Sequence, residues 1–160
     1  MDQTLTTTMT VNGTQVTRAV PARQHLVDFL REELGLTGSH LGCEHGVCGA
    51  CTIRVNGEIV RGCLMLAVQA NGCRVDTIEG LSDSKELAKL QAAFHRHNAL
   101  QCGFCTPGML MAAQDLLNLK KQPSREEIRA HISGNYCRCT GYQAIVDAIE
   151  EVIQTEAIRG

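Results

Sequence analysis

Eight of the nine cysteines in this chain of 160 residues fall into two groups of four. The first quartet is Cys43, Cys48, Cys51 and Cys63, and the second quartet is Cys102, Cys105, Cys137 and Cys139. Thiolates are preferred ligands of zinc, copper(I) and iron-sulfur clusters. Each quartet therefore contains enough ligands for one metal centre.

The spacing within each quartet narrows the choice of metal. The first quartet has the pattern C-x4-C-x2-C followed by a distant fourth cysteine, which is typical of plant-type [2Fe-2S] sites. The second quartet has the pattern C-x2-C…C-x-C, which implies a different wrapping of the chain around the metal. Two unlike sites in one small chain suggest a two-step electron relay, because one metal centre would suffice to store an electron or to stabilise the fold.

Zinc is the main alternative. Cys102 and Cys105 form a C-x2-C knuckle that Cys137 and Cys139 could complete, since four thiolates also suit zinc. The spacing of the first quartet is less typical of zinc. A zinc-stapled interaction module and a free-standing ferredoxin with two clusters therefore remain alternatives to a relay subunit.

The histidines do not suggest a site of their own. His45 lies inside the first cysteine loop, but a Rieske site needs two histidines, and four cysteines are already present. We therefore expect His45 to be a loop residue that faces solvent. No histidine with a third orienting group supports a catalytic cysteine. The same ordinary interpretation applies to the rest, which are His25, His40, His95, His97 and His131.

Composition is consistent with a packed domain in a reducing compartment. The chain is 44% hydrophobic but contains no Trp and only 3% aromatic residues, so its core should be mostly aliphatic. The formal charge of −2 gives no indication of a basic surface that could bind nucleic acid. Neither a signal peptide nor an apolar run of about 18 residues is present, so we expect a cytoplasmic protein with no membrane span. Cys73, the ninth cysteine, is expected to be a buried or weakly reactive thiol.

The elements that position the first quartet should be strands. Residues 1–80 are predicted to be strand-rich, with a hairpin of Thr4–Val11 and Gln15–Val20 around an Asn-Gly turn. A helix is predicted over His25–Leu34, ending at a glycine. A second hairpin, Cys51–Val55 with Glu58–Val60, should return Cys63 toward the loop that carries the other three cysteines.

The second quartet should be positioned by helices in residues 81–160. Apolar periodicity and capping signals predict helices over Ser84–His97, Pro107–Leu119, Ser124 to His131 or Ile132, and Tyr142–Ile153. Four helices of this length predict a small bundle. Each half of the second quartet precedes a helix, and the positive end of a helix suits an anionic cluster. Glycines near every cysteine should let backbone N–H groups point at sulfur, at Gly42, Gly46, Gly49, Gly103, Gly108, Gly134 and Gly141.

Three segments together resemble a known family. These are GCEHGVCGACT at 42–52, QCGFCTPGM at 101–109 and GNYCRCTGY at 134–142. They resemble the iron-sulfur subunit of the molybdenum hydroxylases, the xanthine oxidase family. Bacterial members such as carbon monoxide dehydrogenase and 4-hydroxybenzoyl-CoA reductase keep this part as a separate small subunit. The resemblance extends from about Thr8 to Ile153 and includes all eight cysteines in order.

The resemblance implies an α+β chain, with a β-grasp [2Fe-2S] ferredoxin-like domain over 1–80 and a four-helix-bundle [2Fe-2S] domain over 81–160. All eight quartet cysteines would be ligands of the two clusters. It also implies a large subunit with molybdopterin, commonly the cytosine dinucleotide form in bacteria, and a medium subunit with FAD, often as a dimer of heterotrimers. Electrons would pass from molybdenum to the helical-domain cluster, then to the plant-type cluster and then to flavin. Gln101 and Cys139 would approach the pterin. This chain would not turn over a substrate alone, and the substrate itself stays open.

Overall fold

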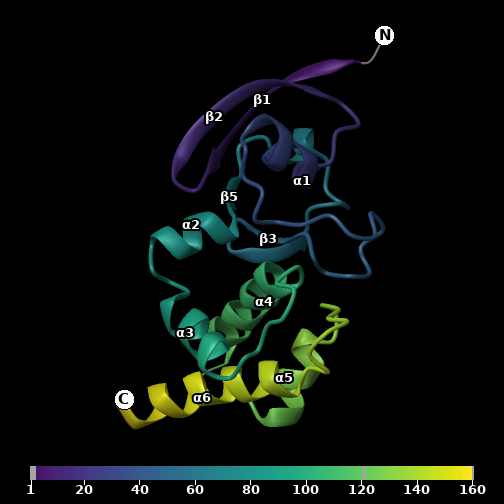
Figure 1. Cartoon of the computed structure of the whole chain (residues 1–160). Coiled ribbons are helices and arrows are strands. Elements are labelled where there is room, and N and C mark those ends of the chain that lie inside the picture. The colour runs from purple at the N-terminus through teal and green to yellow at the C-terminus, as the bar shows by residue number, and fades with distance from the viewer. Residues whose placement is uncertain (1–2, 121, 160) are drawn as a thin grey trace.

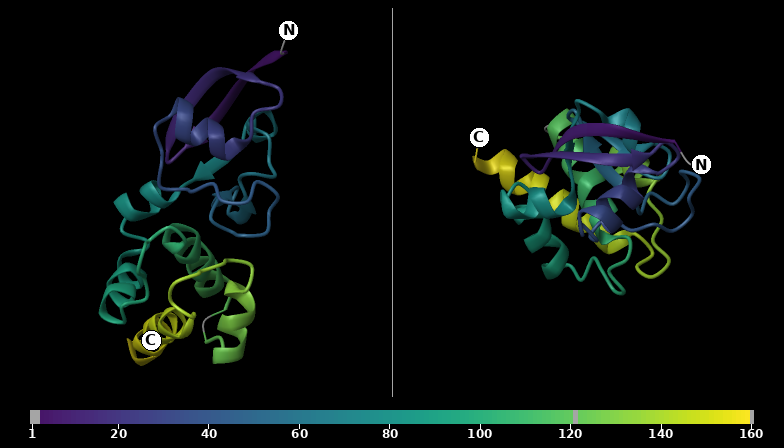
Figure 2. Two further views of the ribbon diagram at one scale, coloured as in Figure 1. Left: turned by 45° about the vertical axis from the view of Figure 1, so that its right-hand side comes forward. Right: turned by 90° about the horizontal axis from the view of Figure 1, so that it is seen from above.

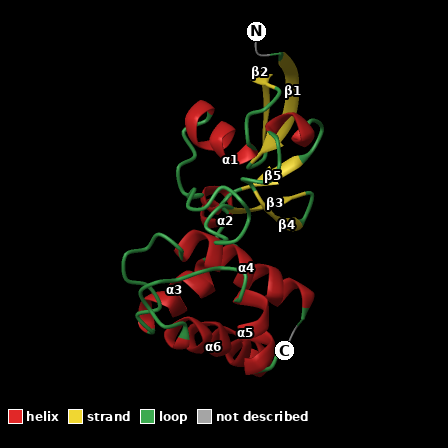
Figure 3. Ribbon diagram, turned by 90° about the vertical axis from the view of Figure 1, so that its right-hand side faces the viewer, coloured by secondary structure: helices red, strands yellow, loops and turns green. Residues whose placement is uncertain are grey.

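The computed structural model describes residues 3–120 and 122–159 and has two parts (Figure 1). A mixed sheet occupies the N-terminal part, and helices form the C-terminal part on one side of it (Figure 2). The strands all lie in the N-terminal part, together with a short helical segment, whereas the C-terminal part is helical, as Figure 3 shows by colour. The fold is thus α+β, as expected.

The first predicted hairpin is confirmed. Strand β1 (Thr4–Val11) pairs antiparallel with β2 (Thr14–Pro21), from Thr4 opposite Pro21 to Val11 opposite Thr14. Asn12 and Gly13 connect them with φ values of 49° and 81°. Two successive residues with positive φ match the right-handed twist of the strands, which explains the Asn-Gly sequence.

The second hairpin is also confirmed. Strand β3 (Thr52–Val55) pairs with β4 (Glu58–Arg61), and Asn56 and Gly57 form the turn. Because β3 begins directly after Cys51 and β4 ends two residues before Cys63, the hairpin brings these two cysteines to the same end of the sheet. Gly62 N–H donates to the Cys51 carbonyl oxygen over 3.1 Å and closes this end.

A fifth strand joins the two hairpins and was not predicted. Strand β5 (Arg74–Asp76) pairs parallel with β1 and antiparallel with β3, which gives the order β2-β1-β5-β3-β4 expected of a β-grasp sheet. A strand of three residues is too short to show alternation in the sequence. The chain reaches it through a 3-10 turn, η2 (Ala67–Ala70).

The helix predicted over His25–Leu34 is present in altered form. It begins as α1 (Leu26–Asp28) and continues as a π-helix, η1 (Phe29–Glu33). Gly35 follows with φ 67°, as a C-terminal cap requires. Leu26, Phe29 and Leu30 are fully buried against the sheet, together with apolar residues of β1, β3 and β5.

The first helical prediction of the C-terminal part was wrong at its start. Instead of one helix over Ser84–His97, the chain forms α2 (Ile78–Asp83) and α3 (Ala88–Arg96). Lys85 has φ 63°, which interrupts the helical backbone between them. An interruption at an ordinary lysine leaves no sequence signal.

The remaining three helices were predicted, although the last extends six residues beyond its predicted end at Ile153. They are α4 (Thr106–Leu119), α5 (Arg125–Ile132) and α6 (Gln143–Arg159). Ser124 caps α5: its hydroxyl accepts from Glu127 N–H, and the Glu127 carboxylate accepts from Ser124 N–H, as the capping box predicted. Helix α4 packs against α2, α3 and α5 and also faces β3 and β4, so it joins the two parts.

Candidate metal centres

The first quartet lies on the loop that follows η1 and at the end of the second hairpin. Cys51 and Cys63 are almost fully buried, with Val27 packed beside them, whereas Cys43 and Cys48 are half-buried. The Cys48 N–H donates to Cys43 Sγ over 3.4 Å, and this bond, together with the backbone N–H groups of His45 and Val47, lowers the pKa of that thiol to about 6. A backbone donor that stabilises a thiolate in this way would also stabilise a sulfur bound to iron.

The four thiols of the first quartet approach one another as two pairs. Cys43 contacts Cys48, and Cys51 contacts Cys63. Burial, together with the neighbouring Cys63 thiol, raises the pKa of Cys51 to about 11. Two buried thiols in contact fit a site that is completed when a metal displaces their protons.

The second quartet is paired in the same way. Cys102 Sγ lies 3.6 Å from Cys139 Sγ, and both residues are exposed. Cys105 contacts Cys137 deeper in the protein, and burial raises the pKa of Cys105 to about 12. Cys105 directly precedes α4, and Cys139 precedes α6 by a short turn. Each half of the quartet therefore lies close to a helix N-terminus, as predicted.

Paired thiols suit two iron atoms better than one zinc ion. In a [2Fe-2S] site each iron takes two of the four protein ligands, whereas tetrahedral zinc brings all four sulfurs around one point. Over residues 3–120 and 122–159, no group of three or more His, Cys, Asp and Glu side chains converges where a single metal ion could bind. The residues therefore fit a pair of [2Fe-2S] clusters.

The turn after Cys137 is closed by three hydrogen bonds. Thr140 Oγ1 lies 3.1 Å from Cys137 Sγ, Tyr142 N–H donates to Thr140 Oγ1 over 3.2 Å, and Cys137 N–H donates to the Tyr142 hydroxyl over 2.9 Å. Burial opposes ionisation of Cys137, but the Thr140 hydroxyl together with the backbone N–H groups of Thr140 and Cys139 outweighs it and lowers the pKa of Cys137. Sequence analysis assigned no role to Thr140 or Tyr142, although both lie in the 134–142 segment.

The loops of the two quartets meet at Asn135, which is 3% exposed. Its Nδ2 donates to the Gly49 carbonyl oxygen over 3.0 Å and to Thr52 Oγ1 over 3.2 Å. The next residue, Tyr136, donates its N–H to the Cys48 carbonyl oxygen over 2.8 Å. One hydrogen bond thus connects a residue beside Cys137 to a cysteine of the first quartet.

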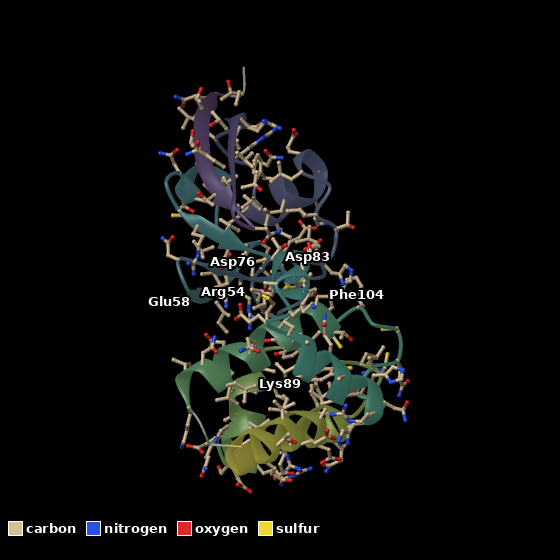
Figure 4. All side chains as sticks on the ribbon, turned by 90° about the vertical axis from the view of Figure 1, so that its left-hand side faces the viewer. Arg54, Glu58, Asp76, Asp83, Lys89 and Phe104 are labelled. Carbon is tan, nitrogen blue, oxygen red and sulfur yellow. The ribbon has the colours of Figure 1, made fainter. Side chains whose placement is uncertain are left out.

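Arg61 strengthens the same junction. Its guanidinium donates to the Gly134 carbonyl oxygen over 2.7 Å and also bonds Thr52 Oγ1. On another side, Arg54 of β3 bonds Glu86 over 2.6 Å and Asp76 over 3.0 Å, between the two parts of the chain (Figure 4). Sequence analysis predicted none of these contacts, because each joins residues that are distant in the chain.

The glycines near the cysteines have two different roles. Gly46, Gly49, Gly103 and Gly141 have positive φ, as the expected loop shapes require. Gly108 has an ordinary helical backbone, but a Cβ there would collide with the Gly49 carbonyl oxygen. The lack of a side chain at Gly108 therefore allows α4 to pack closely against the first cysteine loop.

Gln101 lies beside the second quartet. Its Nε2 donates to the Cys139 carbonyl oxygen over 3.1 Å, and both residues are exposed. The structure thus brings together the two residues expected to approach a pterin. Cys73, by contrast, belongs to neither quartet and packs, half-buried, against the sheet core.

Most histidines have the ordinary roles expected of them. His45 is exposed, and its ring bonds the Cys43 carbonyl oxygen. Three others lie beside carboxylates: His25 near Asp28, His97 near Glu151 and His131 near Asp115.

Known families match both parts of the chain. Residues 9–105 match the family described as 2Fe-2S iron-sulfur cluster binding domain, and residues 77–150 match the [2Fe-2S] binding domain family. No helix in the described part of the chain is long and apolar enough to cross a membrane.

Similar proteins are subunits of oxidoreductases. The caffeine dehydrogenase subunit gamma of Pseudomonas sp. (strain CBB1) is 55% identical over 153 residues, which cover 94% of this chain and 92% of that protein. The nicotine 6-hydroxylase small subunit of Paenarthrobacter nicotinovorans is 57% identical over 139 residues, with coverages of 87% and 84%. The crystal structure of quinoline 2-oxidoreductase from Pseudomonas putida 86 contains a chain with a TM-score of 0.91 and 52% identity, with coverages of 98% and 97%.

These similarities agree with the paired cysteines. The cofactors of this chain are two [2Fe-2S] clusters, and its role is electron transfer as one subunit of an oxidoreductase complex. This chain belongs to the family of small iron-sulfur subunits of the molybdenum hydroxylases.

Proposed function

We propose that this chain carries electrons from a molybdopterin cofactor in a large subunit to FAD in a medium subunit, with the first and second quartets as the cluster ligands. Each bound cluster would accept and release one electron at a time, so two in series could empty a two-electron site stepwise. The observation that carries this proposal is the junction of the two loops, where Tyr136 N–H bonds the Cys48 carbonyl oxygen over 2.8 Å. A short, fixed separation between the sites is what a relay needs.

The exposure of each site suggests which partner it faces. Cys102 and Cys139 are the exposed pair of the second quartet, and Gln101 lies beside them. We propose that this side contacts the large subunit, so that Gln101 and Cys139 approach the pterin. We further propose that the molybdopterin is the cytosine dinucleotide form.

The first quartet has an apolar rim of its own, formed by Val47 and Leu64. Val47 in its loop is 44% exposed, and Leu64, next to Cys63, is 63% exposed. We propose that this rim contacts the FAD-binding subunit. Its buried pair, Cys51 and Cys63, keeps water away from half of the site, while Val47 and Leu64 would exclude water from the other half once a partner covers them.

The same exposed apolar side chains favour a subunit over a free-standing ferredoxin. Large apolar residues are exposed around both sites, namely Val47, Leu64, Leu100, Phe104 and Tyr136. A free carrier would keep such residues covered, whereas a permanent subunit buries them against its partners. We propose a dimer of heterotrimers in the cytoplasm.

We also propose that the chain divides into two cluster-binding domains near residue 80, as 1–80 and 81–160. Strand β5, the last strand of the sheet, ends at Asp76, and α2, whose Ile78 and Leu81 pack with the helical core, ends at Asp83, so the change from sheet to helices lies within a few residues of position 80. The junction at Asn135 then lies between the two domains.

Native purification tests the proposed assembly. The chain is isolated from its own host under mild conditions, and co-purifying chains, molybdenum and flavin are measured in the same fractions. We expect a large chain with molybdopterin and a medium chain with FAD at equal stoichiometry. Recovery of the chain alone, with both clusters and no partner in any fraction, would instead identify a free-standing ferredoxin.

The names of the relatives favour a nitrogen heterocycle as the substrate of the complex. Caffeine, nicotine and quinoline, in the names of the three proteins compared above, are all nitrogen heteroaromatic compounds. The purified complex would be assayed with quinoline, caffeine and benzaldehyde by reduction of an artificial acceptor. Activity confined to benzaldehyde would refute this substrate class without affecting the relay.

A further inference from the structure

We propose that Thr140 raises the reduction potential of the cluster at the second quartet by donating a hydrogen bond to the sulfur of Cys137. This inference rests on the proposed ligand set. It assigns to Thr140 a tuning role that is distinct from holding the cluster.

The direction of the hydrogen bond follows from its neighbours. Tyr142 N–H points at Thr140 Oγ1 over 3.2 Å, and an amide N–H can only donate. The Thr140 oxygen is therefore an acceptor in that contact, and its own hydrogen remains available. Cys137 Sγ lies 3.1 Å from the same oxygen and receives it.

The backbone conformation of this turn fixes the orientation of the Thr140 hydroxyl. Gly141 and Tyr142 both have positive φ, 66° and 69°. A tyrosine rarely adopts this conformation, because its Cβ crowds the backbone. The turn is what lets the Tyr142 N–H reach back to Thr140, so the unfavourable backbone accompanies a fixed orientation of the hydroxyl.

The amide of Cys137 cannot serve the same sulfur. Cys137 N–H donates to the Tyr142 hydroxyl over 2.9 Å and is thereby occupied. At the first quartet the corresponding donor is a backbone group, the Cys48 N–H that reaches Cys43 Sγ. At the second quartet, backbone N–H groups of Cys139 and Thr140 also reach Cys137 Sγ, but the Thr140 hydroxyl belongs to a side chain, so a single substitution can remove it.

A donor at sulfur favours the reduced cluster. Reduction adds negative charge that spreads over the sulfur ligands, and a hydrogen bond to a more negative acceptor is stronger. Hydrogen bonds to the sulfurs therefore raise the potential of an iron-sulfur cluster. Removal of the Thr140 hydroxyl should lower the potential of the second cluster and leave the first unchanged.

Redox titration of the purified complex, followed by EPR of each reduced cluster, tests this role. The variants are Thr140→Val and Thr140→Ala, which lack the hydroxyl, and Thr140→Ser, which keeps it. We expect Thr140→Val and Thr140→Ala to lower the equilibrium constant for one-electron reduction of the second cluster about tenfold, which corresponds to a fall of about 59 mV in its reduction potential. Thr140→Ser should have the reduction potential of the wild type, and all four proteins should contain equal amounts of iron and sulfide.

Three results would overturn the proposal. The first is an unchanged potential in both Thr140→Val and Thr140→Ala. The second is an equal shift of the first cluster, which would indicate a general change of structure. The third is loss of the second cluster from both variants, which would make Thr140 a structural residue. Absence of iron and sulfide from the second site of the wild type would refute the ligand set instead, so the two failures are distinguishable.

Discussion

The ring of His40 stacks on the ring of Phe104, with centroids 4.6 Å apart and planes inclined by 15°. His40 Nδ1 also bonds the Phe104 carbonyl oxygen over 2.7 Å. His40 precedes the first quartet, and Phe104 lies between Cys102 and Cys105, near the junction of the two parts (Figure 4). Together with the Tyr136 to Cys48 hydrogen bond, this contact joins the two cysteine loops from a second direction.

His40→Ala should loosen this junction. An aromatic pair and a hydrogen bond each contribute about 1 kcal/mol, so we expect the free energy of unfolding to fall by about 1–2 kcal/mol. The control is His40→Phe, which keeps the stacked ring and loses only the nitrogen, and should show about half of this loss. Denaturant unfolding under anaerobic conditions measures both. Equal stability of His40→Ala and the wild type would show that the contact contributes nothing.

Gly49→Ala should damage the junction more severely. A Cβ at Gly49 would lie 2.5 Å from the Gly134 carbonyl oxygen and 2.7 Å from Asn135 Cγ, in a residue with φ 75°. Gly13→Ala is the matched control, because Gly13 has φ 81° and a Cβ added there would meet no atom within 4 Å. The control should lose about 1 kcal/mol from backbone strain alone.

Gly49→Ala should lose clearly more stability than this control and should also lose iron from the first site. Iron content and unfolding midpoints of the two variants would be compared side by side. If the two variants lost the same stability, the close approach of the loops would be refuted.

Cys102→Ser should remove the second cluster and leave the spectrum of the first. The exposed pair loses one of its two thiols, so one iron would lack a protein ligand. In the assembled complex we expect substrate to reduce the molybdenum centre without reducing flavin. Stopped-flow spectroscopy of flavin absorbance provides the measurement. Flavin reduction at the wild-type rate would contradict the proposed order of the two sites.

Cys73→Ala should leave both clusters intact. The Cys73 thiol donates two long hydrogen bonds, of 4.0 Å, to the Gln69 and Asn71 carbonyl oxygens. Its side chain lies against the sheet core and contacts neither quartet. Iron and sulfide per chain should therefore equal the wild-type values. A loss of iron would mean that the ninth cysteine had been assigned wrongly.

Local signals in the sequence predicted much of the fold. Both hairpins depend on Asn-Gly turns, whose positive φ values a few residue types favour. The capping box at Ser124 and the proline at the start of α4 marked helix ends in the same way. The cysteine spacing alone indicated which residues form each quartet.

Contacts between distant segments could not be predicted in this way. Strand β5 is too short to show a period and exists because β1 and β3 pair with it on both sides. The break at Lys85 and the contact of His40 with Phe104 likewise depend on how the two parts pack. The same holds for Asn135, whose amide finds its partners in the first cysteine loop.

The most direct test of the electron-transfer role is the content of iron, acid-labile sulfide and zinc in natively purified protein. Each [2Fe-2S] cluster contributes two iron and two sulfide, so we predict about four of each per chain and negligible zinc. EPR of the reduced protein should then show two distinct [2Fe-2S] signals. Zinc bound at either quartet in place of iron and sulfide would contradict the electron-transfer role.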